Sequence, residues 1–253
     1  MSKKESPIKT IIVAVVLSLV CSIVVSFAAI KLKPQQELNK ELDRKRNILI
    51  AAGLLEQGGT QGEIEELFKQ VETHVVDLET GELVEPPKNF NQRKFAKDPE
   101  TNKVLEGKAD IAGIKKRSQL ANVYLVRDGQ QLDTVILPVH GYGLWSTMYG
   151  FLALEPDTTT VVGFKYYEQG ETAGLGGEVE NPTWRAFWPG KEVLNEQGEP
   201  VIKLVKGAAQ NEHQVDGLSG ATLTSNGVEN TLHYWLGKDG FGPFLAKIRA
   251  GEI

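Results

Sequence analysis

The sequence contains 253 residues, of which 41% are hydrophobic and 24% are charged, with a formal net charge of −5. This length holds one large domain or two small ones with a packed core, and the lack of a basic stripe argues against nucleic-acid binding. The single cysteine, Cys21, excludes both an internal disulfide and a Cys-x-x-Cys redox pair. No metal site is expected, since the four histidines are scattered without ligand spacing: His74, His140, His213 and His233.

The first long apolar segment runs over residues 10–30, after an N-terminal tail of residues 1–9. It contains no charge and no proline, and a lysine flanks it on each side. About 20 apolar residues suffice for a helix to cross a bilayer. A cleaved secretory signal is the alternative, since Ser26-Phe27-Ala28 imitates a small-x-small cleavage site, but the run exceeds the roughly 7–15 residues of a signal core. We therefore expect a single uncleaved transmembrane helix in contact with the lipid bilayer.

The basic residues around this segment bear on its orientation. More of them follow the segment than precede it: Lys31, Lys33, Lys40, Arg44, Lys45 and Arg46 against Lys3, Lys4 and Lys9. A count of positive charges alone predicts that the domain after the segment stays in the cytoplasm. Large domains are translocated largely regardless of charge, so the rule is weak for this chain.

Residues 31–118 are expected to form a helical connector and an irregular packing region. Helical patterns cover residues 39–53 and 63–71, the second with its apolar residues on one face. The charged run at residues 43–46 suits a solvated helix face, with a contact to lipid headgroups or a partner as the alternative. Residues 77–118 are rich in turn signals and charge, which indicates an irregular insertion with short strands.

Strand signals begin near residue 119 and predict an α+β domain over residues 119–253. An alternating run, an Asp128-Gly129 turn and a second run are typical of a β-hairpin. Asn181-Pro182 is expected to open a short helix, and Pro243 a final one. These elements predict an antiparallel sheet flanked by helices. The expected strands are residues 123–126, 134–139, 151–154, 161–167 and 201–205.

The stretch from Asp216 to Ser225 is rich in glycine and hydroxyl side chains, and it leads directly into a helical pattern that Gly237 ends. Asn226 is expected to cap this helix, with Glu229 three residues later completing a capping box. The free N–H groups and the positive dipole end of such a helix favour a phosphate. The alternative is an ordinary helix-capping loop, since Ser, Thr, Asn and Gly are common in such loops.

The sequence Asp-Gly-Leu-Ser-Gly-Ala-Thr at residues 216–222 closely resembles the flavinylation motif of FMN-binding domains. In that motif the threonine after Gly-Ala carries FMN through a phosphoester bond. The resemblance therefore implies that Thr222 is the covalent attachment site. Thr224 and Ser225 are also chemically able acceptors, and the register of the motif favours Thr222 over both.

The same resemblance implies that a separate FAD-dependent FMN transferase makes this bond during maturation. It implies recognition of Asp216 and of the small residues Gly220 and Ala221, because bulky side chains there would block the approach of both enzyme and phosphate. Gly220 and Ala221 are also expected to contact the cofactor, together with Ser219 and Thr224.

Residues 171–176 resemble the Glu-Thr-Pro-Gly-Leu-Gly signature of FMN-binding domains, with Ala173 in place of proline. Glycines permit the close backbone approach that a flat ring requires. Leu144 and Trp145 are expected to form one wall of the isoalloxazine pocket, and Lys206 is expected near the flavin phosphate or a ring carbonyl. The alternatives are a simple glycine-rich turn, core packing and a solvent-facing lysine. The cofactor-binding residues implied in the signature are Thr172, Gly174, Leu175 and Gly176.

The order and length of the whole chain resemble those of the C subunits of Na+-translocating NADH:quinone reductases. This resemblance implies an electron-carrying subunit of a membrane complex, with other subunits as partners, located in a bacterial inner membrane with its soluble domain in the periplasm. The chain itself shows no acid–base constellation, no NAD motif and no set of Fe–S cysteines, so no complete active site is expected within it. The G subunit of Rnf complexes is the second resemblance, and a flavin-free membrane-anchored binding or assembly module is a third alternative.

Overall fold

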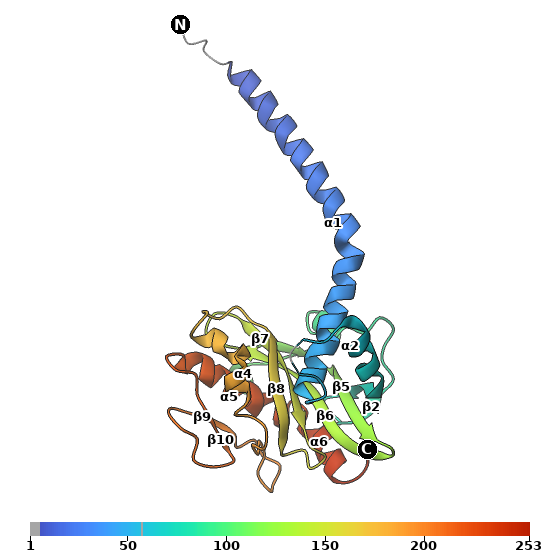
Figure 1. Ribbon diagram of the computed structural model, residues 1–253, viewed down its shortest axis with the longest axis vertical. Coiled ribbons are helices and arrows are strands. Elements are labelled where there is room, and N and C mark those ends of the chain that lie inside the picture. Colours follow the sequence, from blue (N-terminus) through green and yellow to red (C-terminus); the bar gives the residue numbers. More distant parts are fainter. Residues whose placement is uncertain (1–5, 57) are drawn as a thin grey trace. The chain divides into compact units, whose positions relative to one another are not determined.

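The computed structural model describes residues 6–56 and 58–253. The chain forms two compact units, one that ends at Arg44 and one that starts at Lys45. Helix α1 (Pro7–Ala51) forms the described part of the first unit, and its last residues belong to the second (Figure 1).

Helix α1 is one continuous helix of 45 residues with Pro34 inside it. The helix expected at residues 39–53 is therefore the last part of α1 rather than a separate element. Within residues 6–56 and 58–253, α1 is the one helix long and apolar enough to cross a membrane. Its apolar segment exposes large side chains on every side, as a lipid environment requires. Two lysines of the charge pattern lie outside the described residues: Lys3 and Lys4.

The second unit is built on a six-stranded antiparallel sheet with the strand order β2-β1-β5-β6-β7-β8. The predicted hairpin is confirmed, since Asp128 pairs with Gln131 across a turn in which Gly129 has φ +62°. The predicted strands of this sheet are all present. The six strands are β1 (Val71–Asp77), β2 (Leu83–Val84), β5 (Leu120–Asp128), β6 (Gln131–Tyr142), β7 (Thr147–Leu154) and β8 (Val161–Glu168).

Strand β1 lies inside this sheet, although it comes from the region expected to be a connector. It pairs along its whole length with β5, starting with Val71 opposite Val126. The helix expected at residues 63–71 ends earlier, as α2 (Gln61–Leu67) followed by a 3-10 turn (Phe68–Gln70). The region before residue 119 therefore supplies an inner strand of the sheet.

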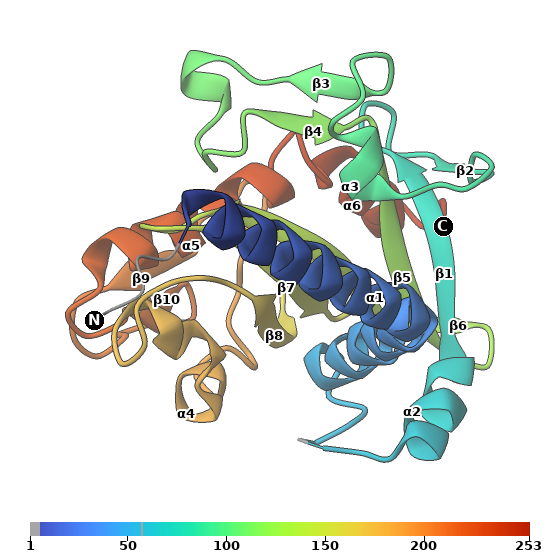
Figure 2. The ribbon, with the colours of Figure 1, turned by 90° about the horizontal axis from the view of Figure 1, so that it is seen from above.

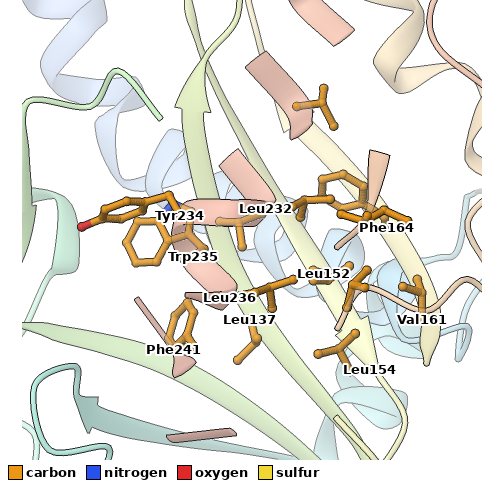
Figure 3. Packing of buried hydrophobic residues seen from close by; sticks show 14 of the residues in the cluster. Leu137, Leu152, Leu154, Val161, Phe164, Leu232, Tyr234, Trp235, Leu236 and Phe241 are labelled. Atoms are coloured by element: carbon orange, nitrogen blue, oxygen red, sulfur yellow. The ribbon is translucent and has the colours of Figure 1, made fainter. Parts of the chain in front are cut away.

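Helices α5 (Thr222–Leu236) and α6 (Gly242–Arg249) cover one face of the sheet. Figure 3 shows part of this core, where Leu232 and Leu236 of α5 lie beside Leu137 of β6 and Leu152 of β7. Leu137 and Leu152 are fully buried in this layer. This core fixes the long axis of α5 and hence the position of its first residue.

The opposite face of the sheet is covered by residues 45–52 and by α2, which both belong to the second unit. Ile48 and Ile64 are fully buried there against Tyr124 and Phe151. Both faces of the central strands are thus buried, with successive residues alternating between the two cores.

Shorter elements lie outside the six-stranded sheet, and two of them lead to the motif. The helix predicted at Asn181-Pro182 is confirmed, with the Asn181 side chain accepting a hydrogen bond from the N–H of Thr183. Figure 2 shows β9 and β10, which pair in parallel, beside α5. The shorter elements are α3 (Gln92–Phe95), β3 (Asn102–Val104), a 3-10 turn (Gly107–Ala109), β4 (Lys116–Ser118), a 3-10 turn (Gly176–Glu180), α4 (Pro182–Arg185), β9 (Lys203–Val205) and β10 (Gln214–Asp216). The predicted α+β architecture is confirmed.

Candidate functional site

Helix α5 starts at Thr222, earlier than the sequence predicts. Ala221 is its N-cap residue and makes no side-chain capping bond, so the prediction of Asn226 as the cap is wrong. Glu229 does not cap the helix either, because its Oε2 accepts a hydrogen bond from the N–H of Leu204 at 2.8 Å. The N–H groups of the first turn therefore have no capping side chain, which suits an anion at this end.

Ser225 holds the preceding loop against this helix. Its Oγ accepts a hydrogen bond from the N–H of Leu218 at 2.9 Å and donates one to the carbonyl of Ala221 at 3.1 Å. Gly220 in the same loop has φ +71°, a left-handed conformation that favours glycine. The loop before Thr222 is thus fixed by the helix that it precedes.

A pocket of about 430 Å³ lies at the start of α5. It brings together five of the predicted site residues, and the rest of its wall comes from β9, the loop before α5 and the first turns of α5. Neither the loop at residues 143–146 nor the glycine-rich stretch at residues 171–176 lines it. The predicted residues in its wall are Lys206, Asp216, Ser219, Gly220 and Thr222, and the others are Leu204, Val205, Gly207, Gly217, Leu218, Ser225 and Asn226.

Asp216 is anchored on both its side chain and its backbone. Its Oδ1 accepts a hydrogen bond from the N–H of Ala209 at 2.6 Å. Its carbonyl accepts one from Nε1 of Trp184 at 2.8 Å. These contacts fix the end of β10 at the pocket wall. Lys206 also lines the pocket, and its side chain is exposed.

The hydroxyl groups at the start of α5 differ sharply in exposure. Thr222 is exposed and lines the pocket. Thr224 is 1% exposed and donates a hydrogen bond to Oε2 of Glu171 at 2.8 Å. Ser225 is 4% exposed and makes the loop contacts described above. Of these three, Thr222 alone offers a hydroxyl to a reagent in solution, and Ser219 is the other exposed hydroxyl in the pocket wall.

Glu171 connects the three predicted stretches, and the sequence reasoning did not assign it a role. Its carboxylate accepts hydrogen bonds from the N–H groups of Leu144, Trp145 and Ser146 at 3.1, 2.9 and 3.0 Å. It also accepts the bond from Thr224 on α5. The sequence signal that could have identified it is a single carboxylate directly before a glycine-rich stretch.

Four apolar side chains on the segments that Glu171 joins are exposed, and together they are called the rim. Leu144, Trp145, Leu175 and Leu223 are 39%, 66%, 43% and 58% exposed. Leu175 lies against the loop before Thr222, because a Cβ placed on Gly220 would be 3.1 Å from its Cδ2. Exposed aliphatic and aromatic surfaces of this kind suit a flat aromatic ring.

The glycine-rich stretch is divided between the surface and the interior. Thr172, Gly174 and Leu175 are exposed, as contact with a ligand requires. Gly176 is buried, and a Cβ on it would lie 2.5 Å from Oγ1 of Thr224. Ala221, the last residue before the helix, is 8% exposed. Gly176 and Ala221 therefore shape the site from beneath rather than facing a ligand.

The pKa of Glu171 predicts a pH-dependent contribution to stability. Burial raises the pKa of this carboxyl, but the hydrogen bonds from Trp145, Thr224, Leu144 and Ser146 outweigh burial and hold it below its ordinary value of 4.5. The stabilisation is therefore complete above the unfolded-state pKa and is lost as the pH falls through the folded-state pKa. Urea unfolding of wild type and Glu171→Gln at several pH values should give a constant difference near neutrality that shrinks below pH 4.5. A pH-independent difference contradicts this assignment.

Comparison with known families agrees with the geometry. The FMN-binding domain family matches residues 143–237, which include the rim, the glycine-rich stretch and the start of α5. Two crystal structures share the fold. NqrC of Shewanella oneidensis aligns with a TM-score of 0.77 at 36% identity, over 84% of this chain and 99% of that chain. The C subunit of the Na(+)-translocating NADH-quinone reductase of Parabacteroides distasonis aligns with a TM-score of 0.66 at 27% identity, over 85% and 96%.

Curated relatives match over the full length. The C subunit of the Na(+)-translocating NADH-quinone reductase of Pseudomonas aeruginosa is 50% identical over 260 residues, and that of Vibrio vulnificus is 52% identical over 257 residues, each covering 100% of both chains. That of Haemophilus ducreyi is 50% identical over 98% of this chain and 96% of its own. The first of the two resemblances is confirmed: the chain belongs to the family of C subunits of Na(+)-translocating NADH-quinone reductases and contains its FMN-binding domain.

Proposed function

We propose that this chain carries FMN through a phosphoester bond to the Thr222 oxygen and serves as an electron-carrying subunit of a Na+-translocating NADH:quinone reductase. The observation that carries the proposal is the exposure of Thr222 at the first residue of α5, between buried Ala221 and buried Thr224. FMN supplies the ability to accept and release electrons one at a time. The chain's own residues bind and orient it.

The residues of the site fit the parts of FMN. The uncapped first turn of α5 and the Lys206 ammonium, both at the pocket, suit the phosphate. The rim side chains Leu144, Trp145 and Leu175 suit the apolar faces of the isoalloxazine ring. The ring edge is polar, and the exposed backbone at Thr172 and Gly174 suits it. Gly176 and Thr224 support this surface from beneath.

Attachment requires a partner enzyme, because no base among the described residues hydrogen-bonds the Thr222 hydroxyl. An FAD-dependent FMN transferase fits: the Thr222 oxygen attacks the flavin-side phosphorus of FAD, AMP leaves, and the hydroxyl proton is released. The small residues Gly220 and Ala221 leave the backbone open to that enzyme. Asp216, held rigidly by Ala209, presents a fixed carboxylate for its recognition.

The remaining steps of the complex belong to other subunits. NADH oxidation, sodium passage and quinone reduction each need groups that this sequence lacks, since it has one cysteine and no dinucleotide fingerprint. Residues 10–30 also contain no carboxylate that could carry an ion across a membrane. We therefore propose that this chain contacts those subunits.

Expression of the full chain with and without an FMN transferase tests the proposal directly. Flavin fluorescence that stays with the polypeptide in a denaturing gel, and only when the transferase is present, is the expected result. A colourless chain despite an active transferase contradicts covalent attachment and favours the flavin-free assembly module.

We further propose that α1 spans the bacterial inner membrane once and that the domain lies in the periplasm, as the resemblance of the sequence to C subunits of these reductases implies. The basic residues after the span favour the opposite orientation, so the question calls for a direct measurement. Protease added to intact spheroplasts should degrade the domain, while a cytoplasmic marker protein survives. Protection of the domain until the cells are lysed reverses the proposed orientation.

A further inference from the structure

We propose that Glu171 is the positioning residue of the flavin site: it fixes the loop at residues 143–146 against the start of α5 and thereby sets the wall on which the flavin ring lies. The inference rests on the proposed attachment of FMN to Thr222. It assigns a role to a buried carboxylate that is remote in sequence from both segments that it joins.

The two carboxylate oxygens have separate partners. Oε1 accepts hydrogen bonds from the N–H groups of Trp145 and Ser146 and from the Ser146 hydroxyl, at 2.9, 3.0 and 3.3 Å. Oε2 accepts them from the N–H of Leu144 and the hydroxyl of Thr224, at 3.1 and 2.8 Å. One carboxylate therefore binds three consecutive backbone N–H groups of the loop and one side chain of α5. Only an acceptor with two oxygens can satisfy both sets.

Two glycines make room for the carboxylate, so its position depends on the residues around it. A Cβ on Gly143 would lie 2.7 Å from Oε1 of Glu171, and one on Gly176 would lie 2.9 Å from Oε2. Glycines on both sides thus admit the carboxylate to the interior, where it is 8% exposed. Buried polar groups with full hydrogen bonding hold their surroundings in one conformation.

Glu171 fixes the backbone that carries Leu144 and Trp145. Their side chains are exposed, while their N–H groups donate hydrogen bonds to Glu171. Without that carboxylate, three N–H groups would be left without their buried acceptor, and the loop would rearrange to hydrate them. Trp145 would then lose its fixed place relative to Thr222. Glu171 thus acts on the flavin through the loop and touches no reacting atom.

The test compares three variants of the full chain in detergent. Glu171→Gln keeps the shape but replaces one acceptor oxygen with an NH2 group that faces N–H donors. Thr224→Val removes one bond and keeps the carboxylate charge. Glu155→Gln, at an exposed carboxyl beyond the end of β7, is the matched control.

The first readout, amide hydrogen exchange on the flavin-free chain, needs no cofactor. Exchange at residues 144–146 should become faster by about tenfold or more in Glu171→Gln and by less in Thr224→Val, and should not change in Glu155→Gln. Wild-type exchange rates in Glu171→Gln overturn the inference. If Glu171→Gln does not fold, wild-type rates in Thr224→Val overturn it.

The second readout, on chains flavinylated by the transferase, is the anisotropy and intensity of flavin fluorescence together with the midpoint potential. Flavin content should be equal in all variants, while Glu171→Gln lowers the anisotropy and relieves quenching by Trp145 several-fold. A potential that shifts in Glu171→Gln with unchanged anisotropy means that the residue acts by its charge, which overturns positioning. A wild type without covalent flavin overturns the function proposed above instead, and leaves the exchange experiment to decide on the loop.

Discussion

Thr222→Ala is expected to abolish the covalent flavin completely, because the substitution removes the one exposed hydroxyl among the residues that begin α5. Thr224 and Ser225 cannot replace it, since both are buried and their hydroxyls are hydrogen-bonded to Glu171 and to the loop. The fold should persist, because the Thr222 side chain makes no hydrogen bond to the rest of the described chain. In-gel flavin fluorescence after co-expression with the transferase, normalised to protein, measures the effect.

Three further variants sharpen this experiment. Thr224→Val should keep the fluorescent band because the hydroxyl that it removes is buried. Ser219→Ala should keep it because the motif assigns the attachment to the threonine after Gly-Ala and not to this serine. Thr222→Ser retains an exposed hydroxyl at the same backbone position and should keep flavin at least in part. A band that survives Thr222→Ala and disappears in Ser219→Ala would move the attachment to the other exposed hydroxyl of the pocket.

Trp235→Ala is expected to cost about 3–5 kcal/mol in the free energy of unfolding, as large aromatic truncations in a core do. Trp235 is fully buried in α5, and its ring packs beside His140 and Phe241 with centroid distances of 4.9 and 5.3 Å. Its Nε1 donates a hydrogen bond to the carbonyl of His140 at 2.6 Å. The variant thus creates a cavity and removes the hydrogen bond to the partly buried carbonyl of His140.

Trp145→Ala is the matched control for this measurement. Trp145 is 66% exposed, so its truncation should change the unfolding free energy by no more than about 0.5 kcal/mol. Urea unfolding of the full chain in detergent, followed by circular dichroism, compares the two. Equal costs for the two tryptophans would contradict the assignment of Trp235 to the core that fixes α5.

Sequence patterns predicted those elements of the fold whose formation depends on neighbouring residues. The Asp128-Gly129 turn and the Asn181-Pro182 helix start depend on neighbouring residues alone, and both are confirmed. Strand β1 escaped prediction because Val71–Asp77 carries charged side chains and lies just before a region full of turn signals. It becomes a strand by pairing with β5, about 50 residues away, and strand formation depends on such partners more than on intrinsic preference.

The residues of the candidate site show the same difference between local and distant signals. The motif register led directly to Thr222, but the start of the helix was misplaced because several hydroxyl and amide residues in succession all have capping chemistry. Ser225 decides the matter through its bonds to Leu218 and Ala221, which place it inside the helix. Glu171 was missed because its partners Leu144 and Thr224 lie 27 and 53 residues away along the chain.

Leu144, Trp145 and Leu175 do not line the pocket that contains Thr222, and this bears on how such a cofactor is retained. A freely dissociating flavin stays bound only if its ring contacts supply the whole binding free energy, which demands a deep, enclosing pocket. With a covalent link at the rigid start of α5, the effective concentration of the ring at the rim does not depend on the flavin in the surrounding solution. The rim can then remain shallow, with Trp145 66% exposed. A site of this kind would leave a ring edge within reach of a neighbouring redox centre, so the proposed permanent attachment would permit open access for electrons.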